Sequence, residues 1–119
     1  MPLKVRRVVT GHDSEGRAVV LSDGPPPQCG VDPEVNVGIA ELWATSEFPA
    51  SNKGHQEAVP DPLPIAPGTR GTVFRVVEFP PEQEEVANTE AVQTYLRNQG
   101  AVTPERPRHP GMHKTHTVD

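Results

Sequence analysis

The segment Gly71-Thr72-Val73-Phe74-Arg75-Val76-Val77-Glu78-Phe79 is the most strongly β-forming stretch of the sequence. β-Branched and aromatic residues dominate it, and these are the residues that are enriched in strands. Its apolar residues occur at both odd and even positions, so both faces of the strand are expected to be covered. Pro80-Pro81 ends the segment, because proline cannot donate a hydrogen bond to a sheet ladder.

Three upstream segments have a similar composition. Residues 3–10 and 17–23 are rich in valine and flank a run of turn-forming residues, which predicts a hairpin. Residues 35–44 form a third predicted strand, with Trp43 at its end. We expect these segments and 71–79 to form one small sheet, in which Trp43, Phe74 and Val77 are substantially buried.

One short helix is predicted over residues 89–98. Asn88 or Thr89 can cap its beginning, and Gly100 is a natural stop at its end. The residues that form its apolar stripe are spaced as on one helix face: Ala91, Val92, Tyr95 and Leu96.

Long loops are predicted in the remainder of the chain, which has fifteen prolines and ten glycines. Residues 46–70 hold five of the prolines and show little periodicity, so we expect a loop there. Cys29 lies in a segment rich in proline and glycine and is expected to be a bystander thiol in a loop. As the only cysteine, it cannot form an internal disulfide.

The charge pattern argues against two classes of partner. The net charge is −5, and residues 31–90 carry eleven acidic residues against three basic ones, so the basic face of a nucleic-acid-binding protein is missing. The apolar run at residues 18–21 is far too short to span a bilayer. We therefore expect no nucleic acid and no membrane as partners, and a cytoplasmic location.

The order of motifs resembles the N-terminal portion of the small single-domain cupin family. Residues 6–13, 16–17 and 20–24 look like the beginning of such proteins, and Glu41-Leu42-Trp43 fits their third segment. Residues 71–81 fit the strand that precedes their barrel, and residues 111–119 fit the approach to their first conserved motif.

The resemblance implies a mainly β fold, the N-terminal part of a double-stranded β-helix or jelly-roll barrel with long proline-rich loops and one short helix. Residues 1–119 would then form a single incomplete domain. Within it, residues 3–79 supply the N-terminal strands and loops, 86–100 a helical insertion, and 101–119 an extended lead into the first cupin motif.

The same resemblance points to metal-ligand positions near residue 119. The first cupin motif typically supplies two histidines and a glutamate. His113 matches the first histidine and Asp119 the glutamate, whereas Thr115 stands in the place of the second histidine and His116 is one residue out of register. We expect no cofactor and no tight metal binding for this chain, although a complete homologue could hold a divalent metal through His113, Asp119 and, less readily, His116.

Two functions from different classes remain open at this stage. A cupin-type protein would bind a small organic molecule or transform it by an oxidation, a decarboxylation or an isomerisation. The alternative is a non-catalytic structural or pairing protein, which could form a homodimer through open strand edges, or an inactive truncated gene product. Whether the chain is an enzyme is undecided by its sequence.

Overall fold

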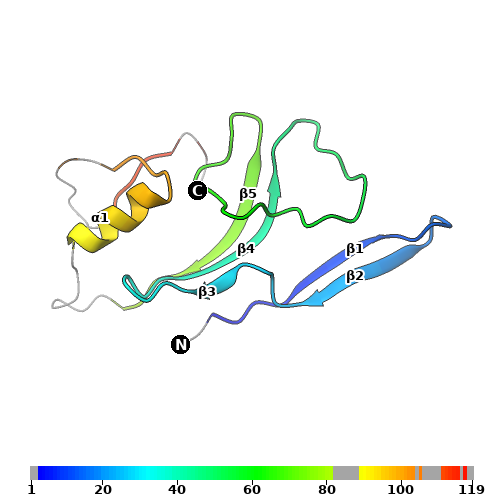
Figure 1. Cartoon of the computed structure of the whole chain (residues 1–119), viewed down its shortest axis with the longest axis horizontal. Helices are drawn as coiled ribbons and strands as arrows, with labels where there is room; N and C mark the ends of the chain where they lie inside the picture. Colours follow the sequence, from blue (N-terminus) through cyan, green and yellow to red (C-terminus); the bar gives the residue numbers. More distant parts are fainter. Residues whose placement is uncertain (1–2, 82–88, 104, 106–110, 116, 118–119) are drawn as a thin grey trace.

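The fold is mainly β, with two antiparallel sheets and one helix in the described residues. A computed structural model describes residues 3–81, 89–103, 105, 111–115 and 117. Five strands and then the helix follow one another along the chain, as Figure 1 shows. The mainly β prediction is confirmed, while the jelly-roll barrel stays a prediction.

The predicted hairpin is confirmed and forms a sheet of its own. Strand β1 (Arg7–His12) pairs with β2 (Ala18–Gly24) in antiparallel register. Asp13 holds the turn between them, because its carboxylate accepts hydrogen bonds from the backbone amides of Glu15 and Arg17 at 2.9 Å each. Gly16 has a φ of 76°, which favours glycine at that position.

The second sheet has the strand order β3-β4-β5. It consists of β3 (Cys29–Val31), β4 (Gly38–Thr45) and β5 (Thr72–Glu78), all antiparallel to their neighbours. The predicted strands at 35–44 and 71–79 are confirmed with shorter bounds. The prediction of one sheet from all four segments was wrong, because the hairpin pairs only with itself among the described strands and extends away from the three-stranded sheet (Figure 1).

Strand β3 was missed in the sequence, where Cys29 was expected in a loop. The strand forms because a turn at residues 32–37 folds the chain back onto β4. Asp32 accepts hydrogen bonds through its carboxylate from the amides of Glu34 and Val35, and its own amide donates to the carbonyl of Val37 at 3.0 Å. Asn36 adopts a φ of 53°, a conformation that asparagine tolerates better than most residues.

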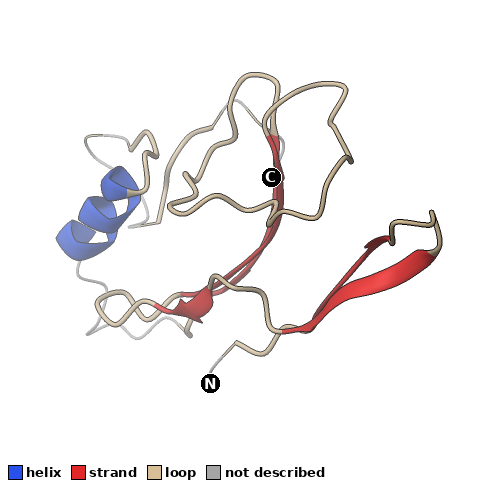
Figure 2. Ribbon diagram, turned by 45° about the vertical axis from the view of Figure 1, so that its right-hand side comes forward, coloured by secondary structure: helices blue, strands red, loops and turns tan. Residues whose placement is uncertain are grey.

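The chain between β4 and β5 is a loop, as predicted, and Figure 2 shows how much of the molecule it makes up. Two of its side chains nevertheless belong to the core, because Val59 and Leu63 are buried. They join Ala40 of β4 and Leu96 of the helix as the buried hydrophobic residues among those described.

The prediction that Trp43 and Phe74 are substantially buried was wrong. They face each other across β4 and β5 and are 42% and 62% exposed, while Val77 is half-buried. Phe74 precedes Arg75, whose guanidinium donates to loop carbonyls, and successive side chains of a strand point to opposite faces. Phe74 therefore points to the opposite face of the sheet from the carbonyls of Pro64 and Ile65.

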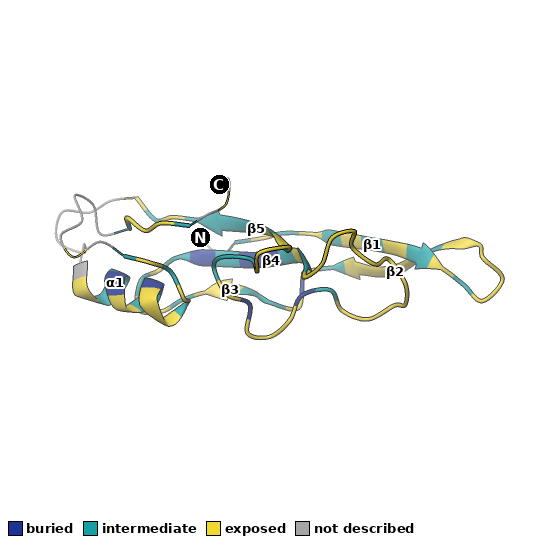
Figure 3. Cartoon of the chain, turned by 90° about the horizontal axis from the view of Figure 1, so that it is seen from above, coloured by how far each residue is buried: buried dark blue, intermediate teal, exposed yellow. Residues whose placement is uncertain are grey.

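Helix α1 (Thr89–Asn98) has the predicted bounds and ends as predicted at Gly100, whose φ is 80°. The amides of Gly100 and Ala101 donate to the carbonyls of Arg97 and Leu96, a pattern that closes a helix end. Residues 86–88 of the predicted insertion lie outside the described residues. Figure 3 shows that buried residues gather on β4 and α1, whereas the hairpin has none.

Candidate functional site

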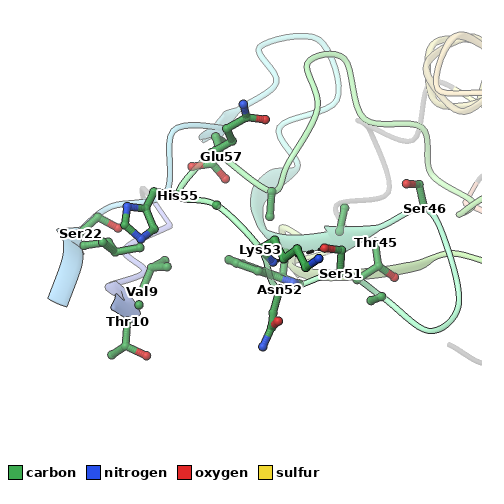
Figure 4. A pocket seen from close by; sticks show the side chains of 18 of the residues that line it. Val9, Thr10, Ser22, Thr45, Ser46, Ser51, Asn52, Lys53, His55 and Glu57 are labelled. Atoms are coloured by element: carbon green, nitrogen blue, oxygen red, sulfur yellow. Dashed lines mark hydrogen bonds between the residues drawn. The ribbon is translucent and has the colours of Figure 1, made fainter. Parts of the chain in front are cut away.

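The described residues border an open hollow of about 800 Å³ between the hairpin and the loop that follows β4. Its walls come from β1 and β2 on one side and from residues 43–47 and 50–58 on the other, as Figure 4 shows for part of the lining. Ligand pockets in proteins have volumes of about 300–1,000 Å³, so this hollow could hold a small organic molecule.

Arg7 joins the two walls of the hollow. Its guanidinium binds the carboxylate of Glu57 through two hydrogen bonds of 2.8 and 2.6 Å and donates a third, of 3.0 Å, to the carbonyl of Leu42. The Arg7 side chain is only 12% exposed. The paired Arg7 holds the pKa of the Glu57 carboxyl below its usual value, and the same hydrogen bond raises the pKa of Arg7.

The apolar part of the wall includes Val9, Leu21 and Trp43. Leu21 lies directly over Gly11, since a Cβ atom at Gly11 would be 2.6 Å from the Leu21 Cδ1 atom. This close approach explains a glycine inside β1.

The polar part of the wall includes His12, Lys53 and His55. In the view of Figure 4, the His55 ring is drawn toward the hairpin residue Ser22, and Lys53 lies nearer to Ser51. No ion pair of these three side chains occurs among the described residues. They can therefore offer hydrogen bonds, and Lys53 a positive charge, to a ligand.

A second group of charged side chains lies between β4, β5 and the long loop, where Glu41 is buried and Arg75 is half-buried. Glu41 and Arg75 form an ion pair of 2.9 Å, and the Arg75 guanidinium also donates to the carbonyls of Pro64 and Ile65 at 2.9 and 3.1 Å. Burial raises the pKa of the nearby Tyr95 hydroxyl, and the negative charge of Asp32 adds to this effect. Because the donors of Arg75 are engaged within the chain, this group holds the fold together and is not a ligand site.

His113, one of the residues predicted as metal ligands, is not among the residues that line the hollow. His113 is exposed, and its Nδ1 atom lies 2.9 Å from the carbonyl oxygen of Gly111. Asp119 and His116 lie outside the described residues. Within the described part of the chain, no three histidine, cysteine, aspartate or glutamate side chains come together as a metal site would require. The metal-ligand assignment stays a prediction, and no chemical step is derived from it.

Sequence reasoning missed the hollow and the residues that shape it. Arg7 and Glu57 are fifty residues apart and no motif contains both, so only the fold brings them together. His55 had no signal in the sequence beyond its place in a polar loop.

No protein-family model matches the sequence, and no curated protein matches it to a significant degree. In the described residues, no helix is both long and apolar enough to cross a membrane.

Proposed function

We propose that this chain belongs to a cupin-type protein that binds a small organic molecule, and that the hollow beside the hairpin is its binding site. The observation that carries the proposal is the hollow itself, whose volume of about 800 Å³ suits such a ligand. The order of the sequence motifs and the mainly β fold support the cupin-type assignment.

The lining indicates what kind of molecule would fit. Trp43 offers an apolar ring, whereas Lys53 and His55 offer hydrogen bonds to acceptors. A planar organic molecule that carries a carboxylate or a carbonyl combines both features. An oxidation, decarboxylation or isomerisation of that molecule is what the resemblance adds, and the divalent metal that the resemblance implies would be held by His113 and Asp119.

A cytoplasmic location is also part of this proposal. A protein with one cysteine does not depend on an internal disulfide and so does not need an oxidising compartment.

Binding can be tested with a panel of fluorine-labelled aromatic carboxylates, phenols and amides, observed by NMR. We expect at least one carboxylate to bind and to shift the Trp43 indole signal, and we expect His55→Ala and Lys53→Ala to weaken that binding at least tenfold. His113→Ala is the matched control, because His113 is an exposed histidine away from the hollow. If no compound of the panel binds, or if His55→Ala and Lys53→Ala bind as well as the His113→Ala control, the hollow is not the binding site.

A pairing protein is the second candidate, and a separate observation favours it. The sequence has five aromatic residues, and four of them are more than two-fifths exposed: Trp43, Phe48, Phe74 and Phe79. Trp43 and Phe74 are neighbours across β4 and β5, and exposed apolar patches mark interaction surfaces. Under this proposal the chain forms a homodimer through open strand edges, and sedimentation equilibrium over a range of concentrations should show twice the mass of one chain.

A further inference from the structure

Strand β5 is an open sheet edge that lacks the usual protection against pairing. It pairs with β4 from Thr72↔Thr45 to Glu78↔Gly38, and no described strand lies on its other side (Figure 1). Edge strands are normally protected by lysine, proline or bulges. β5 has no lysine or proline, and the irregularity of the β4–β5 pairing falls on β4, between Glu41 and Trp43.

The hairpin edge differs in this respect. The pairing of β2 with β1 has an irregularity that leaves Leu21 without a direct partner, and such a bulge twists an edge away from further pairing. Asp23 at its end is engaged by Arg6 in two hydrogen bonds of 2.7 Å. Of the edges of β2 and β5, the edge of β5 is therefore the better template for an added strand.

The positive charge of β5 already has partners within its own chain. Arg75 is bound to Glu41 and to two loop carbonyls, so it needs no partner from an added strand as long as no second guanidinium lies opposite it. Phe74 and Phe79, which are 62% and 72% exposed, lie at or next to the same edge and gain burial if a strand is added.

We propose that β5 pairs antiparallel with β5 of a second copy of this chain, with the two-fold axis at Val76. This inference rests on the pairing function, the second candidate above, and names its partner and register. The result is one continuous six-stranded sheet, since the order β3-β4-β5 meets its own reverse at the axis.

The register follows from symmetry and charge. We consider a two-fold axis perpendicular to the sheet, which leaves each side chain on the same face of the joined sheet in both copies. Such an axis passes midway between one residue of β5 and the same residue of the second copy. An axis at Arg75 would place two guanidinium groups directly opposite each other, which is unfavourable. An axis at Val76 places Val76 opposite its copy, Val73 opposite Phe79, and Arg75 opposite Val77, with no like charges in direct opposition.

An axis at Phe74 gives an overlap of the same length but covers one aromatic residue fewer. With the axis at Val76, the paired segment runs from Val73 to Phe79 in both copies. Moving the axis to Phe74 shifts the paired segment to residues 71–77 and leaves Phe79 outside it. The Val76 register therefore covers the most apolar surface without a charge conflict.

Disulfide trapping tests this register directly. In a Cys29→Ser background, Val76→Cys places two thiols opposite each other, where Cα atoms of antiparallel pairs are about 4.5–5.5 Å apart, within the disulfide range of about 4.4–6.8 Å. We expect most of the protein to form a covalent dimer under mild oxidation. Val77→Cys is the matched control, because its copies would lie about 8 Å apart across the staggered pair and should cross-link at least tenfold less.

A measurement on the unchanged chain guards against misfolding of the variants. Hydrogen exchange of β5 amides should slow as protein concentration rises, while exchange in the β1–β2 hairpin should not change. Dimers that cross-link at Val77, or dimers whose hairpin amides become protected instead, would overturn this register but leave the pairing function intact. A chain that stays monomeric at all concentrations would overturn both, and the ligand-binding test of the hollow is independent of either result.

Discussion

The β1–β2 hairpin and the region formed by β4, β5, the long loop and α1 are stabilised in different ways. The hairpin has no buried residue and is attached through polar contacts, of which the Arg7–Glu57 pair is the main one. The helix-bearing region buries Leu63, Leu96 and Ala40 and encloses an ion pair. An isolated two-stranded hairpin is only marginally stable in water. The comparison indicates that the hairpin depends on its docking to the loop, whereas the other region carries most of the stability.

The largest effect is expected in the helix-bearing region, at the buried ion pair. Glu41→Ala leaves the charge of Arg75 without its carboxylate and should lower the free energy of unfolding by about 3 kcal/mol. Urea denaturation followed by circular dichroism would measure this. Asp23→Ala removes one partner of an exposed pair on the hairpin and should leave the denaturation midpoint almost unchanged. Equal effects of the two variants would contradict the comparison.

A somewhat smaller loss of stability is expected when a buried residue of helix α1 is truncated. Leu96 is 7% exposed, and Leu96→Ala should cost about 2–3 kcal/mol through lost burial and the cavity left behind. Thermal unfolding of this variant and of Thr94→Ala, a change at an exposed position of the same helix, gives a matched pair. An unchanged midpoint for Leu96→Ala would mean that the helix is not part of the stable region.

Two glycines with positive φ allow the same local change to be made in each region. Gly100 and Gly16 have φ values of 80° and 76°, and an added Cβ meets no atom at either place. Alanine at either position should cost about 1 kcal/mol locally, for conformational reasons alone. Gly30→Ala is the control, because Gly30 has no positive φ and has equal space.

Hydrogen exchange shows which region each of the two substitutions, Gly100→Ala and Gly16→Ala, destabilises. Gly100→Ala should speed exchange throughout the helix-bearing region, whereas Gly16→Ala should affect the hairpin alone. If both variants speed exchange in both regions, the chain unfolds as one unit and the distinction fails.

The smallest effect concerns pH and should be confined to the hairpin. The hydrogen bonds from Arg7 lower the pKa of Glu57 from its ordinary value of 4.5, so the charged carboxylate stabilises the docked hairpin. This stabilisation is complete above the ordinary value and is lost as the pH falls through the lowered pKa of the folded state. NMR signals of Gly11 should then shift before those of Leu96. Glu57→Gln should remove this early shift, and simultaneous shifts in the parent chain would argue against separate docking.

The local elements of this protein were largely determined by the sequence itself. Turn residues around Asp13 and Gly16 specified the hairpin, the valine-rich run after Gly71 specified β5, and the spacing from Ala91 to Leu96 specified the helix and its end at Gly100. These elements depend on interactions between residues close in the chain, so composition and periodicity are sufficient to predict them. Strand β3 was not predicted because its three residues show no periodic pattern. The strand forms only through its pairing with β4.

Tertiary structure alone decided which surfaces are covered and where a ligand could bind. Trp43 and Phe74 are the kind of residues expected in a core, yet they are 42% and 62% exposed, while Val59 and Leu63 of a loop without periodicity are buried. The hollow likewise depends on the pairing of Arg7 with Glu57 across fifty residues. Burial is a property of how elements pack, and contacts between distant residues leave no periodic trace in a single sequence, so these features became visible only in the folded chain.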